Sequence, residues 1–171
     1  MASSGSDARP CSITAIFHCL RAGAPMQAAA AIHVTAGIGL DGDRYALGIG
    51  AYTAIEPVKI RHASFISQDG IDSSNAWLAE KGQPAFAAVE TRRNFLVSGI
   101  SADELNALVG RTFTVGKVKF KGLELATPCH RPSRLLKRGG VFELAFAARG
   151  GLRAEVCGSG EIQVGGVLLR E

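Results

Sequence analysis

The chain has 171 residues, the size of one domain, and can bury a core without a disulfide or a metal to stabilise it. Its 47% hydrophobic and 20% charged content is that of an ordinary globular protein, and its apolar runs are too short to span a membrane. The four cysteines form no C-x-x-C pair and no regular framework, which argues against a zinc ribbon and against a secreted disulfide scaffold. We find no signal peptide in the Ser- and Gly-rich opening, so we expect a cytoplasmic protein.

The net charge of +4 is spread unevenly along the chain. Residues 1–60 contain four basic and four acidic side chains, whereas residues 92–138 contain ten Lys or Arg against three acids, a balance of +7. A positive field of this size favours an anionic small ligand or a nucleic acid as the partner. A solvated basic face is the alternative that composition leaves open.

The 21 glycines and the small number of aromatic residues indicate many tight turns and a mainly β fold with short α-helices. We expect a disordered segment over residues 1–10 and a single domain over residues 11–171. Cap residues predict one helix from Asp72 or Ser73 to about Lys81 and another over residues 102–109. Apolar alternation and turn signals predict strands at 12–20, 28–35, 54–60, 64–67, 91–97, 112–115, 118–125, 152–156 and 161–169.

The strand T-R-R-N-F-L-V opens with a polar block. Phe95 and Val97 fall on one face of this strand, and Asn94 falls on the other. Arg92 and Arg93 stand at its start, on opposite sides. Since the arginine fork binds phosphate or other oxyanions with two parallel hydrogen bonds, this pair predicts an anion contact.

The glycine-rich stretch G-I-G-L-D-G-D-R-Y over residues 37–45 predicts a loop. Its glycine spacing does not fit the G-x-G-x-x-G dinucleotide motif. Asp41 and Asp43 resemble the start of a calcium loop, but the remaining oxygen ligands are absent. Arg44 directly follows Asp43, and a loop arginine that a neighbouring acid orients can hold a ligand anion.

The stretch L-A-T-P-C-H-R-P-S-R over residues 125–134 presents a single cysteine, Cys129, between two prolines. Proline and the residue before it are restricted in conformation, so we expect a stiff loop that leaves a strand and is not helical. His130, Arg131 and Arg134 follow the cysteine, and nearby cations favour the thiolate, the form that attacks or binds metals. The alternative is a buried structural thiol.

Six segments in this order resemble the MOSC domain, the family named for the C-terminal domain of molybdenum cofactor sulfurase. They are G-L-D-G-D-R-Y, R-R-N-F-L-V-S-G-I, R-T-F-T-V-G, T-P-C, R-G-G-L-R-A-E-V and G-x-I-x-V-G-G, and they span residues 40–168. The resemblance implies a partly closed β-barrel with short helices. It also implies a cysteine that carries sulfur or ligates molybdenum, at the position of Cys129. Tyr45 stands where the family often has histidine, and Gly165-Gly166 replaces a closing G-D turn.

This resemblance implies a reductase of N-hydroxylated or N-oxide compounds that depends on the molybdenum cofactor (molybdopterin). Its partners would be a small-molecule substrate and an electron-donor protein. Cys129 would ligate the metal, and His130 is a candidate proton donor. The residues expected to bind the cofactor are Asp43, Arg44, Arg92, Arg93, Asn94 and Arg131.

Two other functions remain open on the sequence. In the first, Cys129 carries a persulfide sulfur delivered by a cysteine desulfurase. In the second, a basic barrel binds nucleic acid through Arg92, Arg93 and the Lys117, Lys119 and Lys121 face. Stacking aromatic residues are sparse around these lysines, which argues against nucleic acid.

Overall fold

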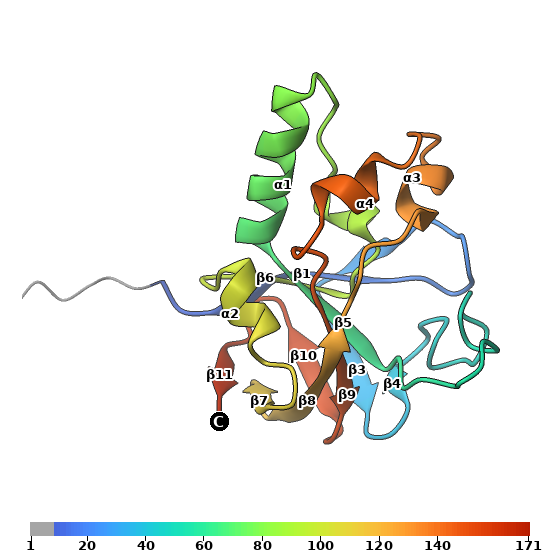
Figure 1. Cartoon of the computed structure of the whole chain (residues 1–171). Coiled ribbons are helices and arrows are strands. Elements are labelled where there is room, and N and C mark those ends of the chain that lie inside the picture. Colours follow the sequence, from blue (N-terminus) through green and yellow to red (C-terminus); the bar gives the residue numbers. More distant parts are fainter. Residues whose placement is uncertain (1–8) are drawn as a thin grey trace, which may run out of the picture.

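Two curled β-sheets form the centre of the computed structural model, which describes residues 9–171 (Figure 1). The strands are β1 (Ser12–His18), β2 (Gln27–Ala29), β3 (Ala31–Thr35), β4 (Gly39–Leu40), β5 (Ala63–Ser67), β6 (Phe95–Ser98), β7 (Thr112–Val115), β8 (Val118–Leu125), β9 (Leu152–Val156), β10 (Gly160–Gln163) and β11 (Leu168–Arg170). The larger sheet has the order β11-β7-β8-β9-β5-β6-β1-β2, and the smaller has the order β10-β3-β4.

The segment just before β11 closes part of the larger sheet onto β1. The Ile13 amide donates to the Gly166 carbonyl at 2.9 Å, and the Leu168 amide donates to the Cys11 carbonyl at 2.8 Å. Because β11 lies at one edge of the sheet and β1 lies next to the other edge strand, these bonds curl the sheet into a partly closed barrel. The predicted mainly β, partly closed barrel is therefore confirmed.

The barrel interior follows from the alternation of side chains along the strands. On β8, Val118 and Phe120 are buried in the core, whereas Lys117, Lys119 and Lys121 are exposed, as the sequence predicted. At the middle of this core the ring of Phe65 on β5 lies 4.9 to 5.3 Å from three other phenylalanine rings, those of Phe95, Phe113 and Phe120. Each such pair adds about 0.5 to 1.5 kcal/mol beyond its buried area, so β5 is firmly fixed.

Helices cover the outer face of the sheet near β5, β6 and β1 (Figure 1). They are α1 (Gln68–Glu80), α4 (Val141–Ala145) and a short 3-10 helix, η1 (Ala88–Thr91), with α3 (Arg131–Leu135) packed beside α4. Leu96 packs into this second core with Phe86 and Phe142, while Phe95 and Val97 face the barrel, so the two faces predicted for β6 are confirmed. Helix α2 (Ala102–Asn106) instead buries Leu105 in the barrel core. Within residues 9–171 we find no helix with the length and apolar character needed to cross a membrane.

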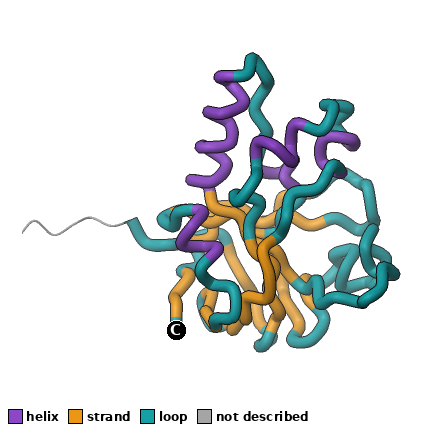
Figure 2. Tube along the Cα trace, viewed as in Figure 1, coloured by secondary structure: helices purple, strands orange, loops and turns teal. Residues whose placement is uncertain are grey.

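Three predicted strands are absent or broken in the structure, and the strand predicted at 12–20 ends at His18. Residues 54–60 form no strand but belong to the long irregular segment 41–62, because no neighbouring strand offers this stretch a hydrogen-bond ladder (Figure 2). The stretch 28–35 breaks at Ala30 into β2 and β3, which join different sheets. The stretch 161–169 breaks at Gly165-Gly166 for the same reason, and Gly165 takes a positive φ that few other residues tolerate.

The observed helix boundaries also differ from the predicted ones. Helix α1 starts at Gln68, four residues before the predicted cap, because the Ser67 hydroxyl accepts the Gly70 amide at 2.8 Å. Helix α2 begins at the predicted capping box but ends at Asn106 instead of residue 109. In the stretch 125–134, Leu125 still belongs to β8 and residues 126–130 form the irregular loop. Helix α3 follows, because proline is tolerated in the first turn of a helix. The expected disordered segment 1–10 lies outside the described residues except for Arg9 and Pro10.

Candidate functional site

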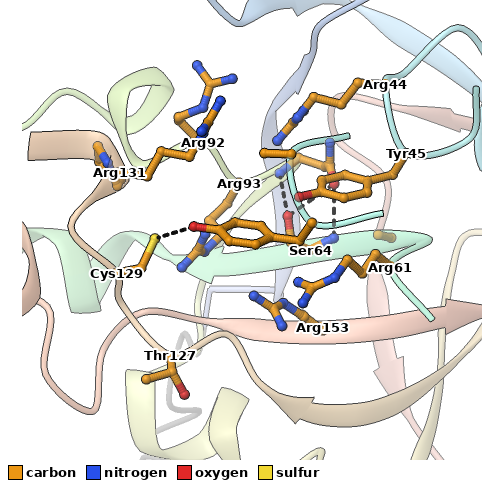
Figure 3. A pocket seen from close by; sticks show the side chains of 15 residues that line it. Arg44, Tyr45, Arg61, Ser64, Arg92, Arg93, Thr127, Cys129, Arg131 and Arg153 are labelled. Carbon is orange, nitrogen blue, oxygen red and sulfur yellow. Dashed lines mark hydrogen bonds between the residues drawn. The ribbon is translucent and has the colours of Figure 1, made fainter. Parts of the chain in front are cut away.

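A cavity of about 660 Å³, part of it open to solvent, lies where β8, β9, β5 and β6 run side by side (Figure 3). Its walls come from the start of β5, the residues just before β6, the loop after β8 and the irregular segment 41–62. Six arginines line this cavity: Arg44, Arg61, Arg92, Arg93, Arg131 and Arg153. Lys, Asp and Glu are all missing from the described part of its wall. We call it the arginine cavity.

Arg92 and Arg93 precede β6 and do not belong to it, contrary to the predicted strand start at residue 91. Arg92 ends η1 in the left-handed conformation, with φ of 61°, which is uncommon for a residue with a side chain. Its guanidinium donates to the Ala24 carbonyl at 2.8 Å. Arg93 donates from Nε to the Gly150 carbonyl at 2.7 Å and from a terminal nitrogen to the Ala126 carbonyl at 3.0 Å. Both guanidinium groups are thus oriented before any ligand binds.

The glycine pair of the R-G-G motif makes the Arg93 contacts possible. A Cβ atom on Gly150 would clash with the Ala126 carbonyl oxygen and lie 2.9 Å from the Pro128 ring, so only glycine allows these segments to meet. The close approach sets the Gly150 and Ala126 carbonyl groups side by side as acceptors for one guanidinium. This explains in physical terms why a glycine turn accompanies the arginine block.

Asn94 lines the arginine cavity, but its amide is already bonded within the protein. Its oxygen accepts from the Ser64 amide and the Ser64 hydroxyl, both at 3.0 Å, and its nitrogen donates to the Phe17 carbonyl at 3.1 Å. These bonds join β1, β5 and β6 beneath the cavity. Asn94 therefore holds these strands together at the base of the cavity, next to Arg92 and Arg93.

Asp43 lies behind Arg44 and does not line the cavity. Its carboxylate is buried, accepts from the Cys19 and Tyr45 amides at 3.1 and 3.2 Å, and pairs with the Arg44 guanidinium at 3.1 Å. The predicted orientation of a loop arginine by its neighbouring acid is thus present. The Arg44 guanidinium also lies 4.9 Å from the centre of the Tyr45 ring, a cation–π contact within the same loop.

Cys129 is half-buried, and its sulfur lies 3.3 Å from the Tyr52 hydroxyl (Figure 3). Burial first, and then this hydrogen bond, raise the pKa of Tyr52, so the phenol stays protonated at neutral pH. His130 is exposed and lies outside the cavity wall, whereas Arg131 at the start of α3 faces into it. The nearest hydroxyl to the thiol is therefore that of Tyr52.

The charges in the cavity are poorly balanced. Among residues 9–171, two of the six arginines pair with a carboxylate: Arg44 with Asp43, and Arg153 with Glu124 at 2.9 Å. Burial and then the charge of Arg153 lower the pKa of Arg93 to about 10, which still leaves it charged at neutral pH. Since several like charges are held together in a partly dry space, an anionic ligand would relieve their repulsion.

Six of the residues singled out in the sequence meet in this cavity: Arg44, Arg92, Arg93, Asn94, Cys129 and Arg131. Their roles as ligands stay predictions. Sequence reasoning missed Tyr45, Tyr52, Arg61 and Arg153 as a group. Tyr45 and Arg153 lie within segments that carry the family resemblance, whereas Tyr52 and Arg61 lie in none.

The profile of the MOSC domain matches residues 60–168 of this sequence. The chain belongs to the MOSC domain family. No curated protein matches the chain. Among solved structures, this MOSC protein is similar to the YuaD protein from Bacillus subtilis, with a TM-score of 0.75 and 15% identity over 92% of this chain and 93% of that one.

The YiiM proteins are two further structural neighbours of this MOSC protein. YiiM from Geobacillus stearothermophilus has a TM-score of 0.68 and 14% identity over 95% of this chain and 75% of that chain. YiiM from Escherichia coli has a TM-score of 0.64 and 14% identity over 95% and 70%. At these identities the likeness supports the fold alone.

Proposed function

We propose that this MOSC protein binds the molybdenum cofactor in the arginine cavity and reduces N-hydroxylated or N-oxide compounds, with the Cys129 thiolate as the protein ligand to the metal. The observation that carries the proposal is the convergence of one thiol and six guanidinium groups on one cavity with no acid in its described wall. The MOSC family is linked to molybdenum cofactor binding, which agrees with this donor set.

The residues fit the cofactor chemically. It is a pterin dithiolene with a terminal phosphate, and a thiolate suits the metal while arginine forks suit the phosphate. The Nε atom of Arg61 is buried without a hydrogen-bond partner in the described protein, which leaves one donor for a ligand. When bound, the cofactor would supply two-electron redox chemistry.

The chain's own residues would have distinct tasks. Arg92 and Arg93, held by backbone carbonyl groups, would bind the phosphate, and Arg44 would be kept in place by Asp43. Tyr52 would hold a proton beside the Cys129 sulfur, a task for which exposed His130 is badly placed. Reduction of R–NHOH to R–NH2 and water consumes two protons and two electrons, so an electron-donor protein and a small-molecule substrate are the partners we propose.

Metal analysis of the purified full chain tests this proposal. The protein is expressed in a host that makes the cofactor, and molybdenum per chain is measured for the native sequence and for Cys129→Ser. We expect near-stoichiometric molybdenum and N-hydroxyl reduction for the native chain, and loss of both in the variant. Cys157→Ser, which changes an exposed cysteine, should retain both. A native chain without molybdenum above background contradicts the proposal.

A sulfur carrier is a second candidate, and the setting of Cys129 supports it as well. The thiol is free and half-buried, and the described wall of the cavity contains no second cysteine that could resolve a persulfide as a disulfide. Guanidinium groups would stabilise a persulfide anion as they do a thiolate. Cyanide-labile sulfur on Cys129 in a chain without molybdenum would favour this candidate. The nucleic-acid alternative is not favoured, because Arg92 and Arg93 line a cavity instead of an exposed face.

A further inference from the structure

Arg61 makes no hydrogen bond or ion pair with any residue in the described part of the chain. Its guanidinium lies 5.1 Å from the centre of the Tyr52 ring and 5.9 Å from that of Tyr45, so the two rings flank it. Its Nε atom is buried without a hydrogen-bond partner among the described residues. Leaving a buried donor unsatisfied is costly, so a ligand acceptor at this place would be favourable.

Arg153 adds a second cation at the same side of the cavity (Figure 3). The two guanidinium groups carry like charges, and burial first, then the charge of Arg153, lower the pKa of Arg61. The nearest acid is Glu124, and its carboxylate is shared between Arg153 and Lys59, both at 2.9 Å. One carboxylate thus faces three cations, and the balance at this side stays positive.

The other cations of the cavity form a separate group. Figure 3 shows Arg61 and Arg153 next to each other on one side of the cavity, and Arg92 and Arg131 together on the other side. Arg93 is already bonded to the Gly150 and Ala126 carbonyl groups. An arginine fork binds a phosphate with two parallel hydrogen bonds, so two separate groups of arginines favour two anion positions.

We propose that Arg61 and Arg153 form a second anion subsite, separate from the Arg44, Arg92 and Arg131 group, that binds a phosphate group against the Tyr52 ring. This phosphate belongs either to a phosphorylated substrate or to a nucleotide extension of the cofactor. The inference rests on the proposed function only for the identity of its ligand. The subsite itself depends on this chain's arginines, and cofactor-free protein is enough to test it.

The test follows the Nε–Hε signals of the arginines by NMR while cofactor-free full-length protein is titrated with inorganic phosphate at constant ionic strength. The signals of Arg61 and Arg153 should follow one binding curve, and those of Arg92 and Arg131 a second curve with a different Kd. Arg61→Gln should weaken the first site about 10- to 100-fold and spare the second. Arg131→Gln should do the reverse.

Two further variants control the experiment. Arg111→Gln changes an exposed arginine outside the cavity and should leave both curves in place. Arg61→Lys keeps the positive charge but removes the Nε–H donor that has no partner. It should therefore weaken phosphate binding at the first site, and thermal unfolding should show that the variant is folded. A single common curve for all cavity arginines, or an Arg61 signal that does not move, overturns the proposal.

Cofactor-loaded protein separates the two sources of the phosphate. If the substrate supplies it, added phosphate still shifts the Arg61 signal, while the Arg131 signal stays fixed. If the cofactor supplies it, the Arg61 signal no longer responds and the extracted pterin carries a nucleotide. A chain that purifies without cofactor ends the reductase proposal, whereas the titration of the free protein still decides the subsite.

Discussion

The Tyr52 hydroxyl and the Cys129 sulfur lie 3.3 Å apart, although 77 positions separate them in the sequence. Tyr52 comes from the irregular segment 41–62, and Cys129 comes from the loop after β8. Their contact places the Tyr52 side chain directly beside the thiol of the arginine cavity.

Tyr52→Ala should expose Cys129, because the variant removes the side chain that lies against the half-buried thiol. We expect alkylation of Cys129 by iodoacetamide to become about 10-fold faster, as measured by mass spectrometry of the peptide that contains it. Tyr52→Phe keeps the ring and should change the rate much less. Exposed Cys157 serves as an internal control, since its rate should be the same in all three proteins. Equal rates for Cys129 in the alanine variant and the native chain would show that the ring does not shield it.

Asp43→Asn should destabilise the fold strongly, because it leaves the buried Arg44 guanidinium without its carboxylate. Breaking a buried pair from one side costs about 3 to 5 kcal/mol. The free energy of unfolding in urea measures this effect. Asp41→Asn is the matched control two residues away, where the exposed pair with His33 should contribute about 1 kcal/mol or less. Similar losses in the two variants would contradict the structural role of Asp43.

Gly150→Ala should destabilise the protein and disturb Arg93, because the added methyl group has no room beside the Ala126 carbonyl and Pro128. Forcing an extra methyl group into a packed site costs about 1 to 3 kcal/mol. Gly158→Ala is the control: its new Cβ would lie 3.5 Å or more from other atoms, and its stability should stay within about 0.5 kcal/mol of the native value. Chemical denaturation compares the variants, and the Arg93 Nε–Hε signal reports the local change.

Stability should fall in mild acid through His62. Its Nδ1 accepts the Val156 amide at 3.2 Å, and burial lowers its pKa below the ordinary value of 6.5. The folded protein therefore holds this ring neutral, so the contribution of His62 is complete above pH 6.5 and is lost as the pH falls through its lowered folded-state pKa. Thermal unfolding between pH 7 and 5 should show a smaller slope for His62→Gln than for the native chain. His33→Gln, at an exposed position, should retain the native slope; if it loses the slope instead, another group is responsible.

Local sequence patterns predict the elements whose conformation depends only on residues close together in the chain. The alternation on β8 and the capping box of α2 needed no knowledge of distant residues. Residues 54–60 contain the β-branched residues typical of a strand, yet a strand needs a neighbour, and the local sequence does not say whether one is present. Pro132 predicts a non-helical stretch, but proline is compatible with the first turn of a helix, which is where Pro132 lies in α3.

The candidate site shows the same division. Cys129, Arg44 and the Arg92–Asn94 block could be assigned to one site because their order along the chain resembles a known family. Arg61 and Tyr52 belong to no such motif, and their contact with the cavity depends on how the irregular segment 41–62 folds back over the sheet. Tertiary contacts, such as those of buried Asp43, set the path of this segment. No periodic pattern in the sequence indicates such contacts.

The backbone hydrogen bonds between the Cys11–Ile13 region and residues 165–168 join β1 to the last strand and so keep the barrel partly closed. A protease that trimmed the chain before Gly165 would leave the free sides of β1 and β7 open at once. Bare strand edges of this kind recruit matching strands from other molecules, so such a clipped product would form exchanged dimers or aggregates instead of a smaller version of the same fold.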